Sequence, residues 1–243
     1  MDGIDPISVT LFAAAAFAAS AIAGLAGFAF GLIAAAFWLH LLGPVETAAL
    51  IVAFGLLIQG VSVWKLRNAI SVRRLLPFVI GSAVGVPFGV SLLHWVPQSY
   101  MRLAVGVFLL AYSTYALLQP KLAVKASNPF IDSLVGVLNG TLAGATGLAG
   151  ILVVIWCTSR GWAKDVQRAV FQPVAVATFA MTAVWLGTAG LVTSRTVWLF
   201  VVGLPAVLAG TWIGLKLYGR LDEPLFRKVV LALLFFSGAA LLA

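Results

Sequence analysis

The sequence predicts an all-helical integral membrane protein made of two inverted repeats, and three observations favour that class. Hydrophobic residues make up 63% of the 243 residues, charged residues only 9%, and the mean hydropathy is +1.12. Soluble domains are nearer half apolar and about a quarter charged. Two glycine clusters, at 24–31 and 140–150, each lie inside an unusually long apolar segment. The distribution of Lys and Arg favours one arrangement of these segments over the other.

The two long apolar segments, 7–42 and 129–159, do not fit a single crossing of a membrane. A bilayer core of roughly 30 Å takes about 20 helical residues, whereas these segments contain 36 and 31. Glycine weakens helices and lets backbones approach closely. We therefore expect each segment to form a broken or re-entrant helical hairpin with the glycine cluster at its tip, and the two tips to meet near the bilayer midplane.

Six further apolar segments have ordinary lengths and are expected to cross the membrane. Charged or turn-forming residues separate them. They cover approximately 47–64, 75–95, 100–118, 166–186, 196–217 and 225–243. The first repeat then spans residues 1–119 and the second 129–243, with a cytoplasmic linker at 120–128.

The basic residues distinguish hairpins from single crossings. If each long segment crosses once, seven Lys and Arg residues lie on one side and eight on the other. If each enters and leaves on the same face, only Arg102 and Arg195 lie opposite the remaining thirteen. The thirteen are Lys65, Arg67, Arg73, Arg74, Lys121, Lys125, Arg160, Lys164, Arg168, Lys216, Arg220, Arg227 and Lys228. Because Lys and Arg gather on the cytoplasmic side, this bias favours the hairpins and predicts that both termini are periplasmic.

An inverted duplication follows from the hairpins. Each half then has three full crossings, an odd number, so the second half enters the membrane from the opposite face. The matching residues are Gly85, Gly89 and Arg102 with Gly210, Gly214 and Arg227 at a spacing of 125, and Gly27 and Glu46 with Gly144 and Asp165 at slightly smaller spacings. Inverted repeats with interrupted helices are typical of secondary transporters whose site lies between the repeats.

Several motifs together resemble the sulfite exporter TauE/SafE family of anion permeases. They are the glycine-rich first segment, the run Pro44 to Ala48, a basic loop after the next helix, the spacing Gly81-x3-Gly85-x3-Gly89, and a second half that repeats this plan. The resemblance implies transport of sulfite, organosulfonates or other sulfur oxyanions across the bacterial inner membrane. The first hairpin departs from the family pattern, since Phe28, Ala29, Phe30 and residues 34–36 occupy a region that is usually richer in glycine.

The hairpin tips are the expected binding site. Helix N-termini at membrane depth offer free N–H groups and positive dipole ends, which hold an anion without a buried cation. Polar side chains inside apolar spans need a partner or a cavity. The candidate substrate-binding residues are Gly27, Gly31, Gln59, Asn139, Gly144, Thr146, Gly147 and Gln172. Helix packing is the alternative role for the glycines and Thr146. Arg168 either pairs with Asp165 or draws anions towards the entrance.

Other functions lack the residues they need. A single cysteine, Cys157, excludes paired-cysteine redox chemistry. His40 and His94 lie near the predicted outer face and no carboxylate lies deep in a span, so neither an intramembrane enzyme nor a buried proton relay is expected. We expect no cofactor and no metal site. The net charge of +8 reflects cytoplasmic loops, and nucleic acid is not an expected partner.

The expected partners are a small anion and the lipid bilayer. We expect export, and an inside-negative potential favours the exit of anions without a coupling ion. Import of thiosulfate or a related anion, a non-transporting membrane scaffold and a homodimer all remain open from the sequence.

Overall fold

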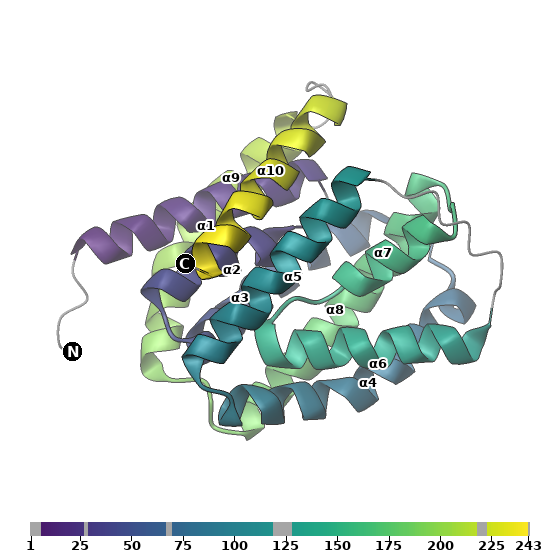
Figure 1. The fold of residues 1–243 in the computed structure, drawn as a ribbon, viewed down its shortest axis with the longest axis horizontal. Helices are drawn as coiled ribbons and strands as arrows, with labels where there is room; N and C mark the ends of the chain where they lie inside the picture. The colour runs from purple at the N-terminus through teal and green to yellow at the C-terminus, as the bar shows by residue number, and fades with distance from the viewer. Residues whose placement is uncertain (1–5, 27–28, 67–69, 119–127, 218–222, 243) are drawn as a thin grey trace.

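The computed structural model describes residues 6–26, 29–66, 70–118, 128–217 and 223–242, and this part of the chain contains ten α-helices and no strand (Figure 1). The helices are α1 Pro6–Ala26, α2 Phe30–Leu41, α3 Pro44–Leu66, α4 Val72–Trp95, α5 Gln98–Leu118, α6 Pro129–Thr146, α7 Ile151–Ser159, α8 Lys164–Thr188, α9 Ser194–Leu217 and α10 Glu223–Leu242. The prediction of an all-helical chain is confirmed. Residue Gly27 and most of the linker at 120–128 lie outside the described residues.

The first long segment is two helices that run back along each other. The break falls between Ala26 and Phe30. The rings of Phe12, early in α1, and Trp38, late in α2, stack with their centroids 4.8 Å apart. Trp38 Nε1 also donates to the carbonyl oxygen of Phe12 at 3.4 Å. The ends of α1 and α2 that lie away from the break are therefore in contact.

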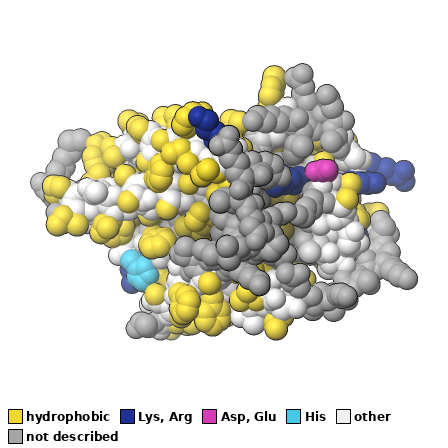
Figure 2. Space-filling model, turned by 90° about the horizontal axis from the view of Figure 1, so that it is seen from above, with side chains coloured by type: hydrophobic (Ala, Val, Ile, Leu, Met, Phe, Trp, Pro, Cys, Tyr) yellow, Lys and Arg dark blue, Asp and Glu magenta, His cyan; other side chains and the backbone are white. Residues whose placement is uncertain are grey.

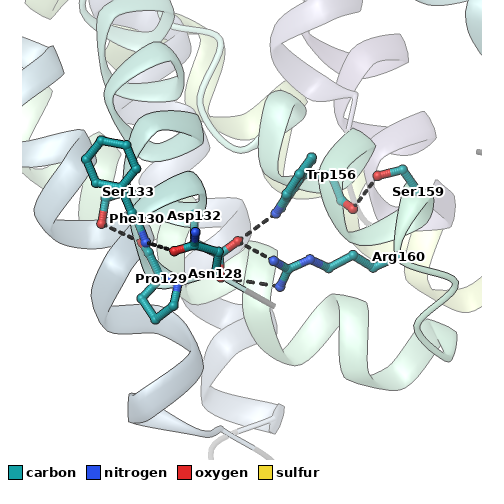
Figure 3. Close-up of polar contacts among 8 residues, drawn as sticks. All are labelled: Asn128, Pro129, Phe130, Asp132, Ser133, Trp156, Ser159 and Arg160. Atoms are coloured by element: carbon teal, nitrogen blue, oxygen red, sulfur yellow. Dashed lines mark hydrogen bonds and ion pairs between the residues drawn. The ribbon is translucent and has the colours of Figure 1, made fainter. Parts of the chain in front are cut away.

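The second long segment reverses direction in the same way, with an ionic contact at its base (Figure 3). Trp156 Nε1, late in α7, donates to Asp132 Oδ1, early in α6, at 2.7 Å. Arg160 Nη2 lies 2.8 Å from the same carboxylate oxygen, and Arg160 Nη1 donates to Asp132 Oδ2 at 3.3 Å. Both charged side chains are at least nine-tenths buried, with 4% and 9% of their surface exposed. A tryptophan late in the segment thus bonds to a residue early in it in both halves.

The two arms of each segment are unequal, because each break lies beyond the centre of its segment. Helix α1 has 21 residues and α2 has 12, whereas α6 has 18 and α7 has 9. Helix α1 continues through Gly24 because that glycine packs directly on the backbone of α9, where a Cβ atom would lie 3.0 Å from Gly214 Cα. The glycines at 24, 140 and 144 therefore serve contacts inside helices, and the breaks come after them.

Six of the described helices are long and apolar enough to cross a membrane: α1, α3, α4, α5, α8 and α9. Five of them are spans that the sequence predicts, and α1 is the long arm of the first hairpin. Large apolar side chains cover the outside, and Phe88, Leu138 and Trp212 each expose more than 60% of their surface. In Figure 2 apolar side chains cover much of the left part, and several Lys and Arg side chains lie towards the right end. Such a surface suits lipid.

Two close helix pairs are formed at glycines, and each pair joins a helix of the first half to a helix of the second half. Helix α4 lies along α6, and α1 lies along α9 (Figure 1). A Cβ atom at Gly85 of α4 would overlap the carbonyl oxygen of Val137, and one at Gly210 of α9 would overlap that of Phe17. Backbone approach at this distance requires residues without side chains, as membrane helix packing often does.

The two helix pairs use the same contacts. Gly85 and Gly89 of α4 meet residues 137, 141 and 144, whereas Gly210 and Gly214 of α9 meet residues 17, 21 and 24. Contacting residues on α1 and α6 are therefore 120 apart, and those on α4 and α9 are 125 apart. This places Gly24 at the position of Gly144, whereas the sequence analysis paired Gly144 with Gly27.

Candidate substrate cavity

The two helix breaks touch each other. A Cβ atom at Gly31, in the first turn of α2, would lie 3.0 Å from Leu148 Cδ2 and 3.8 Å from the carbonyl oxygen of Gly147, between α6 and α7. A Cβ atom at Gly147 would lie 2.9 Å from the carbonyl oxygen of Ala48 on α3. The breaks thus form one junction, and α3 lies against it.

A small cavity lies at this junction. Its volume, measured as the space open to the centre of a water molecule, is about 40 Å³. One water needs roughly 10–15 Å³ on that measure, so the cavity has room for a few waters or a small ion. The lining residues are Ala23, Ala29, Phe30, Gly31, Leu32, Gly55, Ile58, Gln59, Gly147, Leu148, Ala149, Gly150, Ile151, Val154, Phe171 and Phe179.

Two helices begin at the cavity, and their caps match. Helix α2 begins after Ala29, with φ +82° and ψ −7°, and α7 begins after Gly150, with φ +85° and ψ −16°. Neither cap residue supplies a side-chain hydrogen bond. The first amides of a helix have no partner within it and carry the positive end of the helix dipole. Both helices therefore present donors and partial positive charge to the same space.

The side chains around the cavity are almost all apolar. Among its described lining residues, Gln59 on α3 is the one with a polar side chain, and none is charged. Gln59 is 9% exposed. Rings of Phe30, Phe171 and Phe179 occupy other parts of the wall. A ligand here meets backbone amides, one carboxamide and aromatic surface.

Comparison with known proteins identifies a family for the chain. The family model described as Sulfite exporter TauE/SafE matches residues 12–241. The chain belongs to the sulfite exporter TauE/SafE family. No curated protein and no solved structure matches it. Family membership and the apolar helices make the chain a multi-pass membrane protein of an anion-transporting family, which also agrees with a non-enzymatic role.

Three of the residues that the sequence analysis named as ligands line the cavity of this TauE/SafE protein: Gly31, Gln59 and Gly147. Gly144 lies inside the close pair of α6 with α4, where a Cβ atom would lie 2.8 Å from Val90 N. Gly27 lies outside the described residues. Among these candidate glycines, Gly144 therefore packs helices, whereas Gly31 and Gly147 line the cavity.

Thr146 and Asn139 lie beside the cavity and shape the second break. Thr146 Oγ1 donates to the carbonyl oxygen of Leu142 at 2.7 Å and accepts from Leu148 N at 3.2 Å. Asn139 has no exposed surface, and its Oδ1 accepts from Gly150 N at 2.8 Å. Both side chains therefore bond to the loop between α6 and α7, whose residues line the cavity.

The two remaining residues lie on α8. Gln172 is 3% exposed and follows Phe171, which lines the cavity. Arg168 lies one turn before Gln172 and is half-buried. Gln172 thus lies next to the cavity wall, and Arg168 lies nearer the end of α8 that the sequence predicts to be cytoplasmic. Both places are compatible with a path from that end of α8 to the cavity.

Sequence reasoning did not name Ala29, Gly150 or the three phenylalanines as site residues. Gly150 is the last residue of the second glycine cluster, so its part in the break could have been inferred. Ala29 carries no such signal, because alanine rarely adopts a left-handed backbone. Nothing in the sequence distinguishes these three phenylalanines from the rest of its 16 phenylalanines.

Proposed function

We propose that this protein is a secondary transporter that moves a small sulfur-containing anion, such as sulfite or an organosulfonate, across the bacterial inner membrane, in the direction of export. The observation that carries the proposal is the cavity where α2 and α7 both begin, each after a left-handed cap residue with no side-chain hydrogen bond. Anion sites at helix N-termini arise from the free amides and the helix dipole.

The charge of the site favours a monovalent anion. Each helix N-terminus carries about half of a unit positive charge, so α2 and α7 together offset about one negative charge. The described residues that line the cavity include no cation that could offset a second negative charge on the anion. An anion with two negative charges would therefore enter this low-dielectric space with one charge poorly compensated, which is costly. The form of sulfite that this site favours is therefore its singly charged, protonated form, hydrogensulfite.

Gln59 adds the one side-chain donor of the described cavity wall. Its carboxamide has two N–H donors and a carbonyl oxygen, so it can bind a sulfonate or sulfite oxygen without adding charge. Phe30, Phe171 and Phe179 offer apolar surface to the organic part of a sulfonate. The cavity thus combines a neutral donor set with an apolar wall.

The membrane arrangement that we propose has two hairpins entering from opposite faces. The thirteen-to-two distribution of basic residues supports it, because such residues gather on the cytoplasmic side. The equivalent contacts of the α1–α9 and α4–α6 pairs support the duplication on which it depends. In this arrangement both termini are periplasmic and the substrate cavity lies near the bilayer midplane.

Gln59→Leu tests the function. Purified protein in proteoliposomes is expected to carry sulfite and the fixed monovalent anion methanesulfonate, and Gln59→Leu is expected to lower both fluxes at least about tenfold. A hydrogen bond to a charged group contributes about 1.5–3 kcal/mol. Gln98→Leu, at an exposed position in the first turn of α5, is the matched control and should keep wild-type flux. No flux of either anion from the wild-type protein would refute the proposal.

A further inference from the structure

A buried polar network lies behind the second break and joins three helices to it. Asn139 Nδ2, on α6, donates to Ser82 Oγ on α4 at 3.3 Å and to Thr178 Oγ1 on α8 at 3.4 Å. Asn139 Oδ1 accepts from Gly150 N at 2.8 Å. Asn139, Ser82 and Thr178 all have 0% exposed surface. One carboxamide therefore connects α4 and α8 to the cap residue of α7.

The hydroxyl hydrogens determine how this amide is turned. Ser82 Oγ donates to the carbonyl oxygen of Gly136 at 3.1 Å, and Thr178 Oγ1 donates to that of Val174 at 2.8 Å. A hydroxyl has one hydrogen, so both oxygens present lone pairs to Asn139. The nitrogen of Asn139 must face them, and its oxygen must face Gly150. Neither hydrogen of this amide is then available to an anion in the cavity.

The hydrogen bond to Asn139 restricts the backbone of Gly150. This glycine lacks a side chain and adopts φ +85°, and glycine explores left-handed and right-handed backbone conformations at similar cost. A bond to its N–H selects one conformation. Since α7 begins at the next residue, that choice also sets the direction of the first amides of the helix at the cavity.

The first half has no such network at the matching positions. The spacings of 120 for α1 with α6 and 125 for α4 with α9 place Ala19 at the position of Asn139 and Val207 at that of Ser82. Both are buried, with 0% and 1% exposed surface, and both are apolar. The polar network is thus a property of the second break and not a requirement of the duplicated fold.

Resting on the proposed function, we propose that Asn139 is a positioning residue: through Gly150 it sets the N-terminal turn of α7 for the anion, and Ser82 and Thr178 hold Asn139 in that orientation. It acts without contacting the substrate. The backbone of the second break then has its binding conformation before the anion binds. Changes in this network alter the affinity for the anion more than they alter the stability of the fold.

Thr178→Val tests the proposal, with Thr182→Val as its matched control. Thr182 has the same 0% exposure on the same helix and also donates to the carbonyl oxygen four residues earlier, but it is not a hydrogen-bond partner of Asn139. We expect Thr178→Val to raise the KM for sulfite about fivefold, within the range of one lost neutral hydrogen bond, and Thr182→Val to leave it within about twofold. Thr178→Ser keeps the hydroxyl and should retain the wild-type KM.

A second pair separates positioning from stability. Ser82→Ala should raise the KM for sulfite in the same way, whereas Ser113→Ala should not, because Ser113 is equally buried but bonds only within α5. Thermal unfolding in detergent is measured for every variant. Equal KM changes in Thr178→Val and Thr182→Val, or a wild-type KM in both Thr178→Val and Ser82→Ala, would overturn the role of Asn139 while leaving the proposed function intact. Absence of sulfite and methanesulfonate transport by the wild-type protein would overturn both.

Discussion

Ala29 and Gly150 hold the same backbone conformation at the starts of two helices, but only one of them is the residue expected there. Among the described residues, Ala29 is the only non-glycine residue with a positive φ. A left-handed conformation costs an alanine roughly 1–2 kcal/mol. Such strain persists where surrounding contacts enforce it, and it gathers at functional sites. At Ala29 it sits in the cavity wall.

Substitutions at these two caps should have opposite effects on stability. Ala29→Gly relieves the left-handed strain and should stabilise the protein by up to about 1 kcal/mol, after the entropic cost of glycine. Gly150→Ala introduces that strain and brings a Cβ atom to 3.0 Å from Ala175 Cβ, so it should destabilise by about 1–3 kcal/mol. Thermal unfolding in detergent measures both. A loss of stability in Ala29→Gly would show that the alanine side chain contributes more by packing than its backbone strain costs.

The candidate site residues that the sequence could indicate are those with a polar side chain inside an apolar span. Gln59 and Gln172 stand out because an amide within an apolar span needs a partner, and Gln59 indeed lines the cavity. Asn139 carries the same signal and lies behind the wall. Sequence shows that such a side chain is satisfied somewhere, but the partner, whether substrate or backbone, depends on tertiary geometry.

At the scale of elements, glycines spaced four residues apart lie at the contact surfaces of the close pairs α4–α6 and α1–α9. Gly81, Gly85 and Gly89 of α4 all face the backbone of α6. The Gly-x3-Gly spacing is typical of close membrane helix pairs. Each pair joins the long arm of one hairpin to a helix of the other half, so the pairs connect the two halves.

Gly85→Ala should disrupt such a pair. The added methyl group would overlap the carbonyl oxygen of Val137, and backbone cannot move aside as a side chain can. We expect a loss of about 2 kcal/mol or more. Gly60→Ala, in α3 with no atom within 4 Å of the added Cβ, is the control and should stabilise by up to about 1 kcal/mol through helix propensity. Equal unfolding temperatures for the two variants in detergent would contradict the packing.

Segment positions were readable from the sequence, but helix lengths within the hairpins were not. The apolar runs 7–42 and 129–159 correspond closely to α1–α2 and α6–α7. Glycine marks both helix breaks and close helix packing, so a run such as 140–150 does not reveal which glycine does which. The structure assigns Gly140 and Gly144 to packing, and Gly147 and Gly150, both with positive φ, to the break.

At the scale of the whole molecule, the hairpin bases differ although their plan is shared. In the first half Phe12 stacks on Trp38, and in the second Asp132 binds Trp156 and Arg160. Arg160 also lies over the Trp156 and Trp162 rings, at 5.1 and 5.3 Å from their centroids. The base with the charged side chains belongs to the hairpin for which we propose cytoplasmic entry. This polarity agrees with the distribution of basic residues.

We expect transport without a coupling ion, for which the membrane potential is the driving force. A monovalent anion gains about 2.3 kcal/mol per 100 mV, which corresponds to an equilibrium ratio of about 50. In proteoliposomes whose potential is clamped by a potassium gradient, methanesulfonate should therefore reach a ratio of about 50 at 100 mV and a ratio of one at zero potential. Accumulation driven by a pH difference at zero potential would instead demonstrate proton coupling.

The central claim is that two hairpins enter the bilayer from opposite faces and meet at the anion cavity. Cysteines placed singly at Ile7, Gly43, Phe130 and Gly161, each in a Cys157→Ser background, test it with a membrane-impermeant maleimide in oriented vesicles; all four positions lie at the ends of the two long segments. We expect positions 7 and 43 to react from the periplasmic side only, and positions 130 and 161 from the cytoplasmic side only. Reaction of the two positions of either segment from opposite sides would contradict the account.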